Sequence, residues 1–158
     1  ILKFTDDDGK LIRGKKFDDV QQMNDYILEM HNSVVKPGDK YYCLGDVFIG
    51  DRDEFKQLWP RFNGKKNLIT GNHDDIKFLA NGGFFSKIYE SRDLREMGLL
   101  LTHRPAHESQ LWDFKRELPM KNIHGHIHQR FVEGDSWQNV CVEVIDYKPV
   151  NIEELRIR

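Results

Sequence analysis

Three histidines occupy alternate positions in the run from Ile123 to His128, which reads IHGHIH. Alternate side chains of an extended strand share one face, and a tight turn could instead bring His124, His126 and His128 to one point. Imidazole is the commonest protein ligand for transition metals of intermediate hardness. A single histidine would more often be a solvated surface residue, but three of them beside a glycine favour a metal site.

Three other segments place polar side chains directly after an apolar run. They are Gly45-Asp46, the GNHD segment at 71–74 and His103, which follow the apolar runs 41–44, 67–70 and 98–102. Ligands in open α/β sheets collect at the carboxyl ends of the strands, so we expect these turns to meet. Ligation without sulfur fits Mn, Fe, Co, Ni or Zn, and the residues alone do not choose among them. Five donors would then come together: Asp46, Asn72, His103, His126 and His128.

A pair of divalent ions held in this way would suit hydrolysis at phosphorus. Two metals about 3.5–4 Å apart activate a water molecule and neutralise charge on the phosphoryl oxygens during in-line attack. The leaving alkoxide still needs an acid, and His73 is the candidate because Asp74 could accept a hydrogen bond from its ring and fix its tautomer. We therefore expect His73 and Asp74 to be the catalytic residues, with His73 acting as the general acid or stabilising charge on the leaving oxygen.

The order of these segments resembles that of the calcineurin-like metallophosphoesterases. Gly45-Asp46, the GNHD segment at 71–74, His103 and the GHIH segment at 125–128 carry the resemblance. It covers nearly the whole chain and is nearest to small bacterial and phage members that lack a large cap domain. It implies an α/β fold in which two mixed β-sheets pack as a sandwich flanked by helices, a four-layer αββα arrangement.

The same resemblance implies a ligand set for two metal ions. Asp46 would bridge both ions, with Asn72, His103 and His126 completing one site and His128 belonging to the other. We expect two divalent cations, with Mn²⁺ favoured over Fe, Ni, Co or Zn. The expected activity is hydrolysis of a phosphomonoester or phosphodiester, such as a nucleotide.

Two neighbouring residues are weaker candidates for contact with this substrate. Arg104 follows His103 and could hold a phosphate group, with a surface role as the alternative. His124 could also reach a substrate. The alternative that we favour is that it packs in the core or forms a hydrogen bond to one of the metal ligands.

One motif of the resembled family is absent. Those proteins open with a strand that ends in Asp-x-His, whose two residues bind the same metal as His128, and this sequence contains no Asp-x-His. We expect the missing strand to lie upstream of Ile1, so that residues 1–158 form a single phosphoesterase domain short of its first strand. The alternative is a catalytically impaired binding scaffold of the same fold with an incomplete metal centre.

The composition limits the class of partner. The chain has 158 residues, a net charge of −2, 39% hydrophobic and 32% charged residues, which is typical of one globular domain. No apolar run approaches the roughly 18 residues of a membrane span, and no signal peptide is visible. Cys43 and Cys141 do not form a CxxC pair. We expect a cytoplasmic protein that binds neither membranes nor long duplex nucleic acid.

Hydrophobic periodicity predicts the elements that carry these residues. Asp18 is expected to cap a helix that runs to about Ser33, because apolar residues recur there at three- and four-residue steps. His31 lies off this stripe and is expected to be exposed. Helices are also expected at 53–59 and 75–81, with a last turn at 151–156 capped by Asn151. Strands are expected at 41–44, 67–70, 98–102, 121–123 and 140–145. Residues 104–119 are expected to form a loop that contains a helical turn near 111–118, and residues 6–9 a solvated turn.

Overall fold

Three parallel strands form the first sheet of the computed structural model, which describes Gly9 and residues 16–157. Their order is β1-β2-β3, with the bounds Lys40–Cys43, Lys65–Ile69 and Lys87–Tyr89. Strands β1 and β2 correspond to the expected strands at 41–44 and 67–70, whereas β3 was not predicted. Apart from Gly9, the turn expected at 6–9 lies outside the described residues. Ile1, before which the missing strand is expected, also lies outside them.

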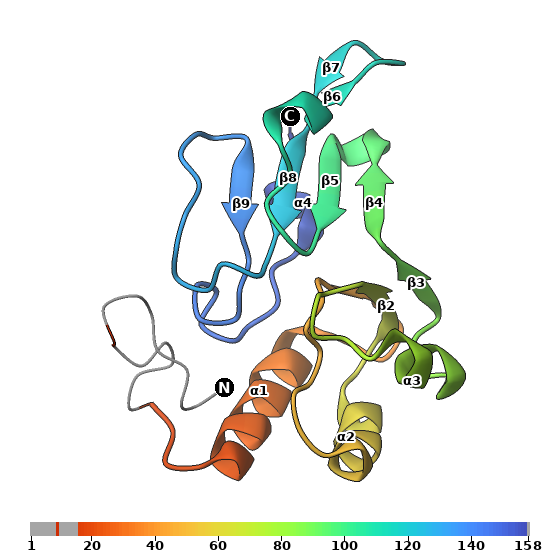
Figure 1. The fold of residues 1–158 in the computed structure, drawn as a ribbon, viewed down its shortest axis with the longest axis vertical. Coiled ribbons are helices and arrows are strands. Elements are labelled where there is room, and N and C mark those ends of the chain that lie inside the picture. The colour runs from red at the N-terminus through yellow and green to blue at the C-terminus, as the bar shows by residue number, and fades with distance from the viewer. Residues whose placement is uncertain (1–8, 10–15, 158) are drawn as a thin grey trace.

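Three helices accompany this sheet in the lower half of Figure 1. They are α1 (Val20–Val34), α2 (Arg52–Leu58) and α3 (Ile76–Asn81). Each follows an aspartate, at Asp19, Asp51 or Asp75, whose side chain accepts a hydrogen bond from a backbone amide of the first turn. The cap of α1 is therefore Asp19 rather than the expected Asp18. Helix α2 continues into a short 3-10 helix, η1 (Trp59–Arg61), that contains Pro60.

The second sheet is mixed and has the order β4-β5-β8-β9. Strand β4 (Ser91–Leu94) is antiparallel to β5 (Leu99–Thr102), and β8 (Lys121–His124) runs parallel to both β5 and β9 (Trp137–Asn139). Leu99, Leu100 and Leu101 of β5 are all buried, as expected for a strand covered on both faces. A short 3-10 helix, η2 (Arg95–Met97), links β4 to β5. The molecule is thus a mixed α/β structure with several small sheets (Figure 1).

Two sequence predictions in the second half of the chain are wrong. No strand forms at 140–145, because β9 ends just before it at Asn139. The Asn139 side chain accepts a hydrogen bond from the backbone N–H of Cys141, and residues 142–147 form turns. The helical turn expected near 111–118 is a hairpin of β6 (Trp112–Asp113) and β7 (Leu118–Pro119), preceded by η3 (Glu108–Gln110). The cap at Asn151 is confirmed, and it begins α4 (Ile152–Leu155).

The two faces of β2 pack into different hydrophobic clusters. Leu68 belongs to a cluster on the helical side, whose buried members are Leu28, Phe55, Trp59, Phe62, Leu68 and Leu79. Ile69, the next residue, packs with Leu99, Leu101 and Ile123 of the second sheet. Since successive residues of a strand point to opposite faces, β2 contributes to the packing on both of its sides. The second cluster joins the two sheets.

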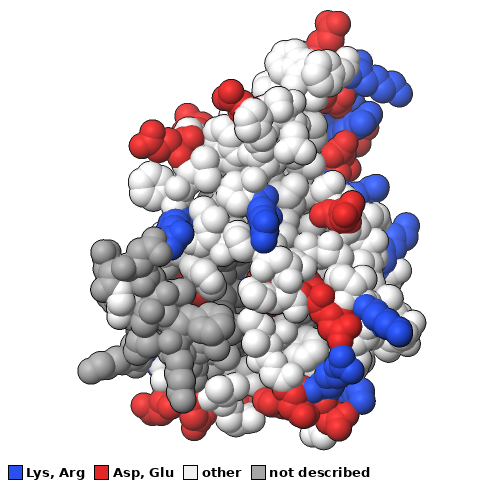
Figure 2. Space-filling model, in the orientation of Figure 1, with Lys and Arg blue, Asp and Glu red and all other residues white. Residues whose placement is uncertain are grey.

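The surface carries no dominant charge on the face that Figure 2 shows. Outside the grey area, basic and acidic side chains are interspersed across this face rather than gathered into a single patch. In the described part of the chain, no helix combines the length and the apolar character that a membrane crossing requires.

His31 is buried, with 2% of its surface exposed, so the prediction that it is exposed is wrong. Its Nε2 atom lies 2.9 Å from the carbonyl oxygen of Asn63, and its ring meets those of Tyr41 and Phe62 edge to face. A neutral imidazole with one hydrogen bond can pack as an aromatic ring, which the hydrophobic stripe did not reveal. Burial lowers the pKa of His31 below its ordinary value of 6.5, and the Lys66 charge adds to this effect.

This burial predicts an acid sensitivity of the fold. The unfolded chain binds a proton at His31 more readily than the folded chain, so stability should begin to fall below pH 6.5. The loss should be complete once the pH is below the depressed pKa of the folded state. The free energy of unfolding, measured by chemical denaturation between about pH 8 and pH 5, checks this. His31→Gln should be less stable at the upper pH but should lose less on acidification, and an unchanged pH dependence would contradict the assignment.

Candidate metal centre

Four side chains converge where β1, β2, β5 and β8 end. The Nε2 atom of His103 lies 3.0 Å from Asn72 Oδ1, 3.1 Å from His126 Nδ1 and 3.4 Å from Asp46 Oδ2. One ligand atom from each of Asp46, His103 and His126 lies within 4.8 Å of the others. The structure therefore brings together four of the five residues that the strand-end pattern selected as ligands.

His103 presents a lone pair rather than a proton to this cluster when it is neutral. Its Nδ1 atom lies 2.7 Å from the carbonyl oxygen of Leu44, which can only accept, so Nδ1–H is the donor. The Nε2 atom then faces a carboxylate oxygen and an amide oxygen, which are acceptors as well. Electron-pair donors of this kind around one point are the set that a divalent cation of the transition series requires.

The charges at the cluster are coupled. Burial lowers the pKa of His103, but the Asp46 carboxylate and the Leu44 carbonyl more than offset it, so the pKa lies above its ordinary value of 6.5. Burial raises the pKa of Asp46, but contacts with His103 and with the backbone N–H of His73 outweigh it, and that pKa is lowered. Burial and the charges of His103 and Arg104 lower the pKa of His126. A positive charge is thus favoured beside Asp46, and a cation could supply it in place of the His103 proton.

The turn after β1 is shaped by glycines. Gly45 has a φ of +84°, and Asp46, which follows it, has a φ of +51°. A Cβ atom on Gly45 would lie 2.6 Å from the Cα of Gly71 and 2.6 Å from His103 Nδ1, closer than such contacts allow. A Cβ atom on Gly71 would overlap the Asp46 carboxylate. The close approach of the β1 and β2 turns therefore depends on both glycines.

Gly45→Ala is expected to disrupt the fold at the site more than a matched glycine change elsewhere. Gly83 also has a positive φ, +66°, but has open space where its Cβ would lie, so Gly83→Ala measures the conformational cost alone, roughly 1–2 kcal/mol. The overlap with Gly71 should add roughly 1–3 kcal/mol for Gly45→Ala. Urea denaturation of both variants gives the comparison, and equal losses would show that the close approach does not matter.

Asp74 supports this turn through the main chain. One carboxylate oxygen accepts hydrogen bonds from the backbone N–H groups of Gly71 at 2.7 Å and Asp46 at 3.1 Å, and the other accepts from Val47 at 2.9 Å. The hydrogen bond predicted from the His73 ring to Asp74 is not found among the described residues. Because a carboxylate prefers these three convergent N–H donors, Asp74 fixes the backbone that carries Asp46 rather than the His73 tautomer.

His73 lies beside the cluster without belonging to it. Its backbone N–H donates to Asp46 Oδ1 at 2.9 Å, and the residue is exposed. Its side chain lines a cavity of about 1390 Å³ that Asp46, His103 and His126 also line. The ring is therefore free to meet a molecule that enters the cavity next to the four converging side chains.

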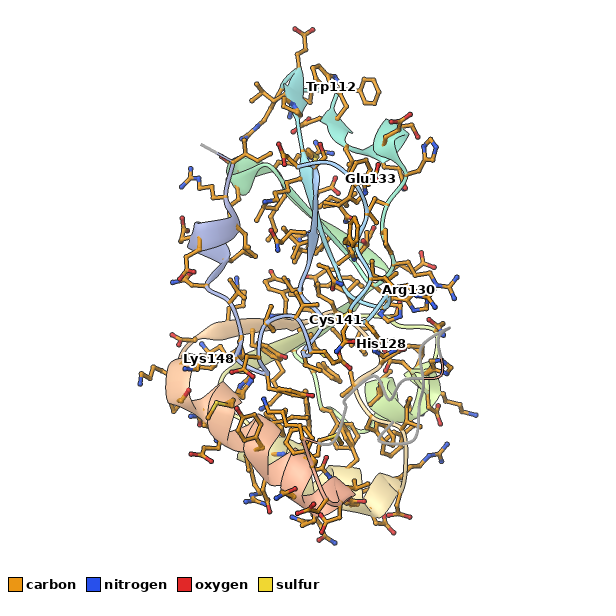
Figure 3. All side chains as sticks on the ribbon, turned by 90° about the vertical axis from the view of Figure 1, so that its left-hand side faces the viewer. Trp112, His128, Arg130, Glu133, Cys141 and Lys148 are labelled. Carbon is orange, nitrogen blue, oxygen red and sulfur yellow. The ribbon has the colours of Figure 1, made fainter. Side chains whose placement is uncertain are left out.

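His128, the fifth expected ligand, is not among the converging atoms. Its Nδ1 atom lies 3.1 Å from Oε1 of Glu143, and its own backbone has a φ of +53°. In Figure 3, His128 lies near mid-height of the molecule, close to the segment that carries Cys141. The sequence analysis did not identify Glu143 as a partner of His128. The one indication in the sequence is that Glu143 is the single carboxylate in the otherwise apolar run 140–145.

The two weaker substrate candidates differ in their surroundings. Arg104 is exposed and close enough to His126 for its charge to lower the pKa of that histidine. His124 is fully buried in β8, with Nδ1 lying 3.0 Å from the carbonyl oxygen of Gly125. Its burial contradicts a direct contact with substrate and fits the packing role that was the alternative.

Comparison with known proteins finds similar chains but assigns no activity. No protein-family model matches the chain. The chain is similar to an uncharacterized protein of Methanocaldococcus jannaschii, with 28% identity over 148 residues that cover 88% of this chain and 76% of that protein. It is also similar to the crystal structure of a protein of unknown function from Aquifex aeolicus. That match has a TM-score of 0.64 and 28% identity and covers 87% of this chain and 85% of the other.

Proposed function

We propose that this protein is a metal-dependent phosphoesterase of the calcineurin-like type, and that its two sheets form the inner layers of a four-layer αββα sandwich. The observation that carries the proposal is the convergence of Asp46, Asn72, His103 and His126, which follow the ends of β1, β2, β5 and β8. The second hydrophobic cluster, in which Ile69 packs against β5 and β8, supports two sheets packed face to face.

The four converging residues would hold one divalent cation, and His128 would contribute to a second. When bound, such ions neutralise negative charge on a phosphoryl group and lower the pKa of a water molecule, and Mn²⁺ is the ion that we propose. The remaining roles belong to the side chains. Asp46 supplies a carboxylate with two oxygens, which would allow it to contribute to both sites.

The residues around the cluster would orient the phosphate ester. The guanidinium of Arg104 can donate two hydrogen bonds to phosphate oxygens on the solvent side of His126. The His73 ring, exposed on the cavity wall, can donate a proton to the leaving oxygen. The proposed substrates are phosphomonoesters or phosphodiesters of nucleotide size, since the cavity is far larger than a phosphate group.

Hydrolysis of a chromogenic phosphodiester and the corresponding monoester, with Mn²⁺, Co²⁺, Ni²⁺, Zn²⁺ or Mg²⁺ added to the chelator-treated protein, tests the proposal. We expect turnover that depends on added metal and is largest with Mn²⁺. The phosphate released and the metal bound should be measured on the same samples. Stoichiometric metal binding without turnover of either substrate would contradict the esterase assignment while leaving the metal site standing.

A second function has one observation in its favour. His128 pairs with Glu143 and does not join the converging atoms, so the described residues assemble one cluster rather than two. A protein with a single-ion centre would serve as a binding scaffold that holds a phosphorylated ligand without cleaving it. Binding of a nucleoside monophosphate by calorimetry, in the presence of Mn²⁺ and without phosphate release, would favour this function.

A further inference from the structure

The Glu143 carboxylate is buried beside a half-exposed histidine. The Glu143 side chain is 3% exposed and the His128 side chain is 39% exposed, and their Oε1 and Nδ1 atoms are 3.1 Å apart. An ionised carboxylate loses much hydration free energy on burial and is retained where it meets donors. Glu143 is therefore placed to accept from His128 by a fold that excludes water from the carboxylate but not from the ring.

The segments that carry the two residues are tied together by Asn139. Its side-chain amide donates to the carbonyl oxygens of His128, at 2.6 Å, and Arg130, at 2.8 Å. Its side-chain oxygen accepts from the backbone N–H of Cys141 at 2.8 Å. The turn that contains His128 and the turn that contains Glu143 are thus held in register at the end of β9, so their contact does not depend on the two side chains alone.

We infer that Glu143 is a positioning residue, which holds His128 as its Nδ1–H tautomer and leaves the Nε2 lone pair available to a divalent cation at the neighbouring centre. A carboxylate acceptor at one ring nitrogen fixes which nitrogen carries the proton and orients the ring. His128 and Glu143 line the same cavity as Asp46 and His126, so the free nitrogen belongs to this region of the molecule. The tautomer follows from the contact itself, whereas its use in metal binding rests on the proposed function.

The tautomer can be read directly in the chelator-treated full chain by ¹⁵N NMR of the histidine side chains. We expect His128 in the wild type to be the Nδ1–H form. Glu143→Gln retains a carbonyl oxygen at the same position and should keep this tautomer. Glu143→Leu removes the acceptor and should shift His128 toward the Nε2–H form. Glu133→Leu is the matched control, because it removes an exposed carboxylate from the preceding loop, and it should change nothing.

Titration with Mn²⁺ supplies the second measurement. Glu143→Leu removes a hydrogen-bond partner of a proposed metal ligand. It should therefore lower the affinity for the ion to which His128 would contribute by about 10- to 100-fold, and Glu143→Gln should retain most of the wild-type affinity. An Nε2–H tautomer in the wild type, or unchanged spectra and affinity in Glu143→Leu, would overturn the inference. If the wild type bound no Mn²⁺ while the tautomer shifted as expected, the proposed function would fail and the positioning of His128 would stand.

Discussion

Asp46→Asn is expected to abolish phosphoesterase turnover and to lower the affinity for Mn²⁺ by more than roughly 10- to 100-fold. That range is the usual loss when a hydrogen-bond partner of a metal ligand is removed, and Asp46 is expected to be a ligand itself. The substitution removes the negative charge that faces His103 Nε2 at 3.4 Å, while an amide oxygen can still accept from the His73 N–H. The fold should therefore survive although the site does not. A carboxylate shared by two ions should lower the stoichiometry at both, which calorimetric titration and metal analysis measure.

The matched control for this change is Asp53→Asn. Asp53 is exposed on α2 and pairs with Lys56 at the surface, so its substitution alters the net charge equally without touching the cluster. Metal stoichiometry that remained the same in Asp46→Asn would remove the bridging role. Equal losses of affinity in the two variants would instead point to a general effect of charge on metal binding.

His73→Ala is expected to lower kcat by about 10²–10⁴ while leaving the metal content nearly intact. The exposed ring lies on the cavity wall and is not among the atoms that surround His103 Nε2. The contact that His73 makes with Asp46 uses its backbone N–H, which alanine retains. Steady-state kinetics with the chromogenic ester and metal analysis of the same sample separate the two effects.

His107→Ala provides a comparison for this variant. His107 is an exposed histidine at the start of η3, outside the cavity, and its loss should leave kcat unchanged. If His73→Ala lost its metal, the residue would be a ligand rather than an acid. A kcat equal to that of His107→Ala would remove His73 from the reaction.

The strands that position the site were predictable because three of them contain continuous runs of mostly apolar residues. The runs 41–44, 67–70 and 98–102 are apolar on both faces, a pattern that strands between helices or between sheets produce. Strand β4 was missed because Ser91, Arg92 and Asp93 are exposed and carry no periodic signal. Its place is determined by pairing with β5, a contact that the local sequence does not encode.

The candidate site was predictable in its donors but not in their hydrogen-bond partners. The spacing of polar residues after strands identified Asp46, Asn72, His103 and His126, which the structure brings together. The bond from His103 to the Leu44 carbonyl and the contact between His128 and Glu143 depend on the tertiary arrangement of distant turns. The same limitation explains His31, whose burial follows from Asn63 and Tyr41 rather than from its place on the helix.

The metal-binding cluster is locally frustrated when His103 is neutral, because the lone pair on its Nε2 faces other lone pairs. Each of these groups would find a better partner in water than in its neighbours, and a cation or an added proton is needed to reconcile them. A sequence selected only for stability would place apolar residues there, as it does at Ile69 and Ile123, which lie in β2 and β8 a few residues before Asn72 and His126. Under the proposed function the site would be a trade-off between stability and activity, and we expect an apolar replacement of His126 to give a more stable protein that binds metal less well.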